Sequence, residues 1–370
     1  MPFAILFLLF GILSGLVRIG LFSFSSFPPL PLYHPYFMIY GFFLALISLE
    51  RVVAFPQKWA FLAPCFAILG TFLHILQNFS IYPCSLVGWG LYILSTLILL
   101  GIYLSLLQTS FPKGSKKGCW KDRLFWGQIF MALGALFLLA GTGAFFFHNS
   151  ILAASYWILF FVATIFGERL ELSRIKGEFP SLFSLESFLL LLAAFLLLLW
   201  NILVLFLPFP KILPLLGLSM MLLSLWCLKY DQIWRTLTFK GLPRYSSLNL
   251  LAAYVWLLFF GFYSLFYHSF IYDIWLHSIL LGFVFSMVFA HGPLIFPAIS
   301  GISFPFTRLF YLPPLLLHVT LILRFLSRWF GKTDILRWTA LAQGLSILLF
   351  FGIILLQVIK VKKGAAHVRR

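Results

Sequence analysis

The stretch LHSILLGFVFSMVFAHGPLIFPAI, residues Leu276 to Ile299, has no Asp, Glu, Lys or Arg among its 24 residues. An α-helix needs about 20 predominantly apolar residues to cross the hydrocarbon core of a bilayer. A transmembrane β-strand would instead alternate apolar and polar residues, and this stretch shows no such alternation. The stretch therefore predicts a membrane-spanning helix.

Similar apolar runs, bounded by charged residues, Pro or Gly, recur along the whole chain. They predict spans at 3–22, 34–54, 59–79, 83–107, 124–147, 150–167, 184–207, 212–228, 247–268, 273–296, 306–326 and 337–359. The first run lacks the charged start and the cleavage site of a signal peptide, so we count it as a span. We expect an all-α fold: a polytopic transmembrane bundle of about 12 helices, forming a single integral membrane domain over residues 1–370.

The composition excludes a soluble protein, because 62% of the residues are hydrophobic and only 9% are charged. A net charge of +17 raises the question of nucleic acid, but the basic residues lie in short runs between apolar spans. We therefore expect the lipid bilayer as a partner and no nucleic acid. No P-loop, GxGxxG, HExxH or GxSxG motif is present, which excludes an ATP-driven transporter with its motor on this chain.

Lys and Arg counts predict the orientation of the bundle. With both termini cytoplasmic, the even-numbered loops and the C-terminal tail hold 20 of the 26 basic residues, and the odd-numbered loops hold 5. The exception is the eleventh loop, which carries Arg324, Arg328, Lys332 and Arg337. We expect both termini to be cytoplasmic and the protein to be multi-pass in a plasma membrane, with a bacterial inner membrane as the expected location.

The histidines follow this topology. Those expected at the outer ends of spans, or toward the outer side, are His34, His74, His148, His268 and His277. His291 lies within the tenth span, where ionisable residues usually mark functional sites. His277 and His291 are fourteen residues apart, which in an α-helix places them on one face, ~21 Å apart along the axis.

Histidines recur every four helices, on the second, sixth and tenth spans. This recurrence suggests a pseudo-repeat of four-helix units over 1–107, 124–228 and 247–359. The pairs Glu50-Arg51 and Glu168-Arg169 mark the expected inner ends of the second and sixth spans. Salt-bridged topology anchors and a proton-uptake role both remain open for these pairs.

This arrangement resembles the catalytic-subunit architecture of haem-copper oxidases. Three motifs of those oxidases are absent: the His-His pair on the seventh span, the His-x-His on the tenth and the His-x-x-x-Tyr on the sixth. The segments HPYFMIYGFFLALISLERVVAF (34–55), GERLELSR (167–174), GLPR (241–244) and HSILLGFVFSMVFAHGPLIFPAI (277–299) resemble membrane proteins of the NnrS family. That resemblance implies haem b and/or copper and a link to nitric oxide. It implies His34, His277 and His291 as cofactor ligands, and His148, His268 and His74 are further metal-ligand candidates.

Three functions remain open. The first is a haem- or copper-binding membrane protein related to respiratory or nitric-oxide metabolism. The second is a secondary transporter or channel for a small solute, favoured by the helix count and the prolines near the tenth and eleventh spans. The third is an assembly or scaffold protein of the membrane. The sequence does not decide whether the protein is an enzyme, or its oligomeric state.

Overall fold

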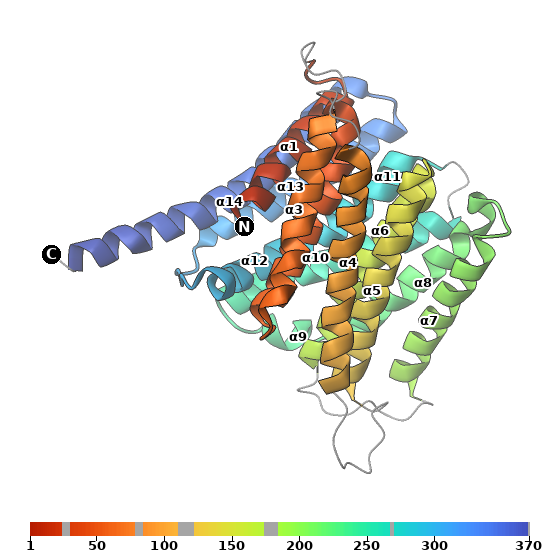
Figure 1. The fold of residues 1–370 in the computed structure, drawn as a ribbon, viewed down its shortest axis with the longest axis horizontal. Helices are drawn as coiled ribbons and strands as arrows, with labels where there is room; N and C mark the ends of the chain where they lie inside the picture. The colour runs from red at the N-terminus through yellow and green to blue at the C-terminus, as the bar shows by residue number, and fades with distance from the viewer. Residues whose placement is uncertain (24–29, 78–83, 110–121, 174–183, 267–269, 369–370) are drawn as a thin grey trace. The chain divides into compact units, whose positions relative to one another are not determined.

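The structure is a computed structural model that describes residues 1–23, 30–77, 84–109, 122–173, 184–266 and 270–368. All regular secondary structure in these ranges is helical (Figure 1). The chain forms two compact units, Met1–Gly177 and Glu178–Arg370, and each is described by itself.

Eleven helical segments in the described ranges are long and apolar enough to cross a membrane. They are Leu30–Val53, Lys58–Leu76, Cys84–Gln108, Arg123–Phe146, Ser150–Leu172, Leu185–Leu203, Phe209–Tyr230, Leu242–Phe266, Tyr272–Ser300, Arg308–Trp329 and Thr333–Lys363. The first predicted span forms a shorter apolar helix, α1 (Pro2–Arg18). The all-α, multi-span prediction is confirmed, whereas the count of twelve and the orientation of the termini stay predictions.

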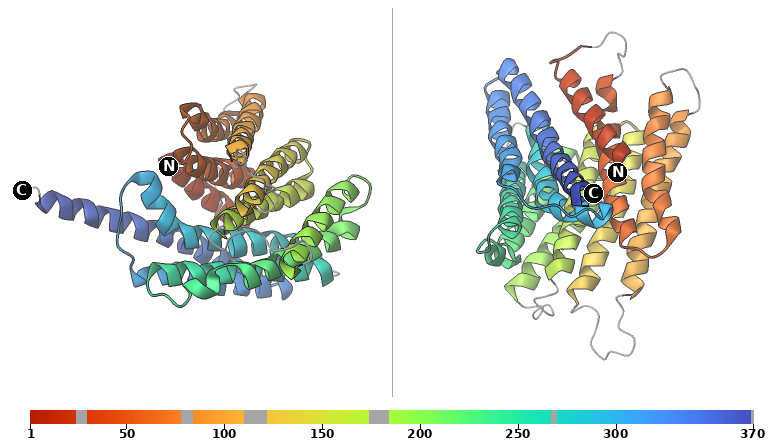
Figure 2. Two further views of the ribbon diagram at one scale, coloured as in Figure 1. Left: turned by 90° about the horizontal axis from the view of Figure 1, so that it is seen from below. Right: turned by 90° about the vertical axis from the view of Figure 1, so that its left-hand side faces the viewer.

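The first unit contains α1, a second segment built from η1 (Leu30–Tyr33), η2 (Tyr36–Leu44) and α2 (Ala45–Val53), then η3 (Lys58–Phe61), α3 (Leu62–Leu76), α4 (Cys84–Thr109), α5 (Arg123–Phe146) and α6 (Ser150–Leu172). Helices α5 and α6 lie side by side in each view (Figures 1 and 2). A side chain caps the N-terminus of each helix. Asp122 accepts a hydrogen bond from the Leu124 amide, and Asn149 accepts one from the Leu152 amide.

The second unit contains α7 (Leu185–Leu203), α8 (Phe209–Tyr230), α9 (Ile233–Thr236), α10 (Leu242–Phe266), a segment built from α11 (Tyr272–His277), η7 (Ser278–Val284) and α12 (Phe285–Ser300), then η8 (Arg308–Tyr311), α13 (Leu312–Trp329) and α14 (Thr333–Val368). Helix α14 packs on α13 and continues as one long helix beyond it (Figure 2). The boundary between the two observed units falls at Gly177, which lies inside the predicted four-helix unit 124–228. The four-helix repeat itself stays a prediction.

Small residues let pairs of helices approach closely within each unit. A Cβ atom added to Gly167 on α6 would lie 2.6 Å from the Gly127 carbonyl oxygen on α5. A Cβ atom on Gly217 of α8 would lie 2.7 Å from the Gly261 carbonyl oxygen on α10. Close backbone contact of this kind drives helix association in lipid, where the hydrophobic effect between helices is weak.

A π-helical segment interrupts one span in each unit. Segment η2 begins two residues after His34, and η7 begins directly after His277. Neither was predicted from the apolar pattern. A π turn contains more residues than an α turn, so the placement of His277 and His291 on one face no longer follows from their spacing, which assumed α-helical geometry throughout. Such segments frequently occur at functional sites.

Candidate functional site

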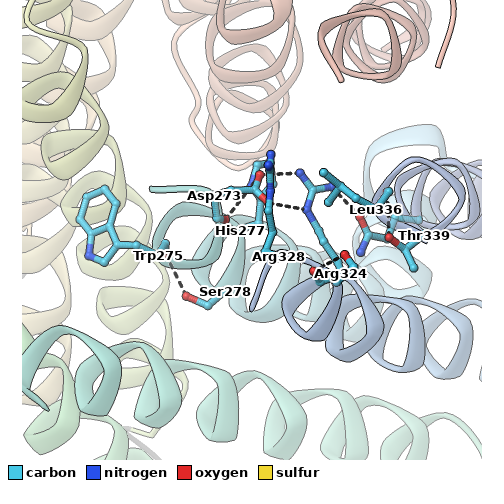
Figure 3. Close-up of polar contacts among 10 residues, drawn as sticks. Asp273, Trp275, His277, Ser278, Arg324, Arg328, Leu336 and Thr339 are labelled. Atoms are coloured by element: carbon cyan, nitrogen blue, oxygen red, sulfur yellow. Dashed lines mark hydrogen bonds and ion pairs between the residues drawn. The ribbon is translucent and has the colours of Figure 1, made fainter. Parts of the chain in front are cut away.

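Asp273, in the first turn of α11, is the centre of a network of charged side chains (Figure 3). Its Oδ1 atom accepts from Arg324 Nη2 at 2.6 Å and lies 3.0 Å from His277 Nδ1. Its Oδ2 atom accepts from Arg324 Nε and from Arg328 Nε, each at 3.0 Å. Both arginines belong to α13, so Asp273 joins two spans of the second unit.

The network is largely removed from solvent. The side chain of Asp273 is 14% exposed and that of Arg324 is 6% exposed, whereas that of Arg328 is 36% exposed. Arg324 Nη1 also donates to Gln343 Oε1 on α14 at 3.0 Å, so all three of its nitrogens are hydrogen-bonded. A buried charge is tolerated when it is paired and its hydrogen bonds are satisfied, and Arg324 meets both conditions.

Asp273 determines how the imidazole of His277 is presented. His277 Nδ1 lies 3.0 Å from the carboxylate of Asp273 and 2.9 Å from its backbone carbonyl oxygen, so Nδ1 carries the hydrogen. In the neutral ring the lone pair is then on Nε2. Metal-binding histidines generally have this arrangement, because a carboxylate on the second nitrogen orients the ring and makes it more basic.

The other two predicted cofactor ligands have a weaker form of the same arrangement. His34 Nδ1 lies 2.7 Å from the Gly11 carbonyl oxygen, and His291 Nδ1 lies 2.9 Å from the Met287 carbonyl oxygen. Both rings are therefore in the Nδ1–H form, but a carbonyl replaces the carboxylate. His34 belongs to the first unit, whereas His291 belongs to the second.

The three additional metal-ligand candidates lie in different surroundings. His74 is 2% exposed, and its ring packs against Tyr36, Trp89 and Tyr92. Its Nε2 atom is buried and has no hydrogen-bond partner among the described residues. His148 is exposed in the turn between α5 and α6, with a positive φ of 61°. His268 lies outside the described residues.

His318 on α13 has the opposite tautomer to His277. Trp256 Nε1 donates to His318 Nδ1 at 3.1 Å, so Nδ1 accepts and the hydrogen of the neutral ring is on Nε2. A protonated Nε2 cannot bind a metal. His318 is thus a natural comparison for His277 within the same unit.

The residues that the structure describes do not form a closed metal site from side chains alone. In the described part of the chain, no group of three or more His, Cys, Asp or Glu residues could hold a metal ion. Copper or zinc bound by protein side chains generally needs three or four such ligands. Haem iron needs only one or two, because the porphyrin supplies the other four nitrogens.

The first unit contains a separate network at the end of the second span. Arg51 on α2 binds Glu168 Oε1 at 2.5 Å and Glu171 Oε2 at 3.5 Å, both on α6. Gln128 Nε2 on α5 donates to the same Glu171 oxygen at 3.4 Å. The predicted salt bridging of these residues is present, but Arg51 pairs across helices rather than with its neighbour Glu50.

Sequence reasoning missed Asp273 and Gln343, and it interpreted Arg324 and Arg328 as loop charges. A signal was available, because Asp273 and His277 are four residues apart on one helix and Arg324 and Arg328 are four apart on another. A residue four positions away lies on the same helical face. The pairing of these two faces, however, is visible only in the structure.

The apolar spans, joined within each unit by ion pairs between helices, define a polytopic helical membrane protein. The chain belongs to the family described as a domain of unknown function, DUF8744, whose model matches residues 1–359. No curated protein and no solved structure matches the chain.

Proposed function

We propose that the protein is a haem-binding integral membrane protein in which the Nε2 atom of His277 would hold the iron. The observation that carries this proposal is the contact between His277 Nδ1 and the Asp273 carboxylate, which leaves the Nε2 lone pair for a metal. Arg324 holds Asp273 through two hydrogen bonds, so the carboxylate that orients the ring is itself fixed.

The set of donors fits haem better than copper. One well-oriented imidazole is sufficient for haem, whereas a copper site would need several side chains that the described residues do not bring together. His277 is preferred over His34 and His291 because its Nδ1 faces a carboxylate rather than a carbonyl. The chain has no Cys-x-x-Cys-His motif, which favours a non-covalent haem b.

The resemblance to the NnrS family supports a role in respiratory or nitric-oxide metabolism. A haem held by His277 would supply the chemistry for binding small gases such as nitric oxide. The contribution of this chain is to orient the His277 ring and to hold the Asp273 carboxylate in place. We assign no catalytic residue.

The network also supports the proposed topology, with both termini cytoplasmic. The argument against it was the eleventh loop, whose four basic residues Arg324, Arg328, Lys332 and Arg337 were counted on the outer side. Arg324 and Arg328 both bind Asp273 within the second unit, and Arg324 is buried. The orientation rule counts Lys and Arg in the loops, and a basic residue buried within a span is not a loop charge. We propose a multi-pass protein of a plasma membrane, with a bacterial inner membrane as its location.

An absorption spectrum tests the proposed function. We expect protein purified from haem-replete cells to show a Soret band and to release haem b on acid extraction. H277A is expected to lose most of the bound haem, and H318A is expected to keep it, because of these two histidines His277 is the one with an unprotonated Nε2. Absence of haem from the wild-type protein, or equal haem content in H277A and H318A, would contradict the proposal.

A further inference from the structure

Two connectors of the second unit lie on the same side of the membrane. The first, residues 231–241, joins α8 to α10, and the second, residues 301–307, joins α12 to η8 and α13. Two spans, α10 and the segment of α11, η7 and α12, lie between these connectors along the chain. Because each span crosses the bilayer once, both connectors return to the same membrane surface.

The first connector is folded against the ends of the spans. Ile233 on α9 is fully buried, and Thr236 Oγ1 lies 2.5 Å from Ser247 Oγ on α10. Trp234 Nε1 donates to the Leu228 carbonyl oxygen at 2.6 Å, although the residue is 54% exposed. Helix α9 thus holds its exposed side chains in fixed places at this end of the second unit (Figure 1).

The two connectors meet at the start of α10. A Cβ atom added to Gly241 would lie 4.0 Å from the Phe306 ring, and the ring centres of Tyr245 and Phe306 are 5.6 Å apart. These contacts bring the segment that carries Arg244 against the segment that carries Arg308.

The exposed charged side chains that the structure describes on these connectors and the adjoining helix ends are all basic. We call them the basic face: Lys229, Arg235, Lys240, Arg244 and Arg308. None of the five forms an ion pair with a described residue. Asp231 and Glu186, which the order of the spans places on this side, are 5% and 9% exposed. Outside the described residues the chain has one acidic residue, Glu178, which is too few to neutralise five basic ones.

Large apolar side chains are exposed beside the basic ones. Trp234 is 54% exposed, Phe239 is 48% exposed and Leu309 is 57% exposed, and each is the sequence neighbour of a residue of the basic face. At a membrane surface, aromatic rings lie at the depth of the headgroups, and Lys and Arg attract anionic lipids. An acidic soluble partner would account for the charges but not for the apolar side chains, so the combination favours a lipid.

We propose that the basic face binds the phosphate groups of anionic phospholipids, with Arg244 and Arg308 at its centre. Guanidinium groups bind phosphate through charge-assisted hydrogen bonds, and Phe239 and Leu309 supply apolar contacts for the lipid. The inference rests on the membrane-spanning fold and does not depend on haem.

Native mass spectrometry of the purified full chain tests the proposal by titration with phosphatidylglycerol and, separately, with phosphatidylcholine of the same acyl chains. We expect phosphatidylglycerol to bind at least 25-fold more tightly, with a difference that shrinks as the ionic strength rises. The variant R244Q/R308Q should weaken phosphatidylglycerol binding by about 25-fold, or about fivefold for each arginine, and should leave phosphatidylcholine binding unchanged.

The matched control is K211Q/K332Q, which also removes two exposed basic residues of the second unit, but on the connectors of the opposite side. It should keep the phosphatidylglycerol affinity within about twofold of wild type. Equal binding of the two lipids by the wild-type protein, which needs no variant to fold, would overturn the proposal. Equal losses in the two double variants would also overturn it. So would displacement of phosphatidylglycerol by the same concentration of glycerol 3-phosphate or of a glutamate peptide, because the ligand would then be a free anion or an acidic protein.

Discussion

Replacing Asp273 with Asn removes the negative charge that two arginines share in the second unit. Asn keeps the size of the side chain but offers one acceptor oxygen in place of two. Its amide group would then face a guanidinium group, because both carboxylate oxygens accept from Arg324 in the native protein. Arg324, with a side chain only 6% exposed, would remain buried without its counter-charge.

The expected cost follows from this burial. Removing one partner of a buried ion pair costs about 3–5 kcal/mol, because the other charge stays desolvated. Arg328 adds at most about 1 kcal/mol, because its side chain is 36% exposed and surface ion pairs contribute little. We therefore expect D273N to lower the free energy of unfolding by about 3–5 kcal/mol.

Unfolding of the purified protein in mixed micelles, followed by tryptophan fluorescence as the mole fraction of sodium dodecyl sulfate rises, measures this change. The matched control is D334N, because Asp334 is 86% exposed and pairs with Arg337 at 3.4 Å. The control should change the unfolding free energy by less than about 1 kcal/mol. Adding R324M to D273N should restore at least half of the loss, since it removes the buried unpaired charge.

Equal effects of D273N and D334N would refute the reasoning. A failure of R324M to improve D273N would also refute it, because the cost would then not come from the unpaired guanidinium.

The other predictions concern packing and a buried hydrogen bond. G217V should destabilise the protein by about 1–3 kcal/mol, because its Cβ would lie 2.7 Å from the Gly261 carbonyl oxygen. The control is G352A on α14, where no atom lies within 4 Å of the added Cβ. It should be neutral or stabilise the protein by up to about 1 kcal/mol. Similar unfolding midpoints for the two variants would contradict this. Y40F should cost about 0.6 kcal/mol, since it removes the 3.0 Å hydrogen bond to Thr142, and a cost above about 2 kcal/mol would show a further role for the hydroxyl.

The sequence predicted the spans well because their signal is local. An apolar run of the right length has few alternatives in a bilayer, and the stretch Leu276–Ile299 lies within the observed span Tyr272–Ser300. The first run was less well predicted. It extended to residue 22, whereas α1 ends at Arg18 and has 17 residues.

The π-helical segments could not be predicted from the same signal. Residues 278–284 are as apolar as the residues that follow them in α12, so hydropathy does not distinguish the two geometries. The choice depends on how the span packs against its neighbours. A Cβ on Gly282 within η7, for example, would lie 2.5 Å from the Trp256 ring on α10.

The ion-pair networks could not be predicted, because the paired residues are far apart in the sequence. Asp273 and Arg324 are 51 residues apart, and Arg51 and Glu168 are 117 residues apart. Adjacent charges in the sequence favoured the pairing of Glu50 with Arg51, but side chains at neighbouring helical positions point in different directions. His277 was predicted as a ligand from its position and from a resemblance, without the carboxylate that orients it.

Chemical rescue of H277G tests the central claim most directly. The glycine variant leaves space for free imidazole while Asp273 and both arginines remain. We predict that the wild-type protein has a Soret band, that H277G loses or shifts this band, and that imidazole restores it while leaving H318G unchanged. A wild-type protein without haem, or an H277G spectrum identical to that of the wild type and insensitive to imidazole, would contradict the account.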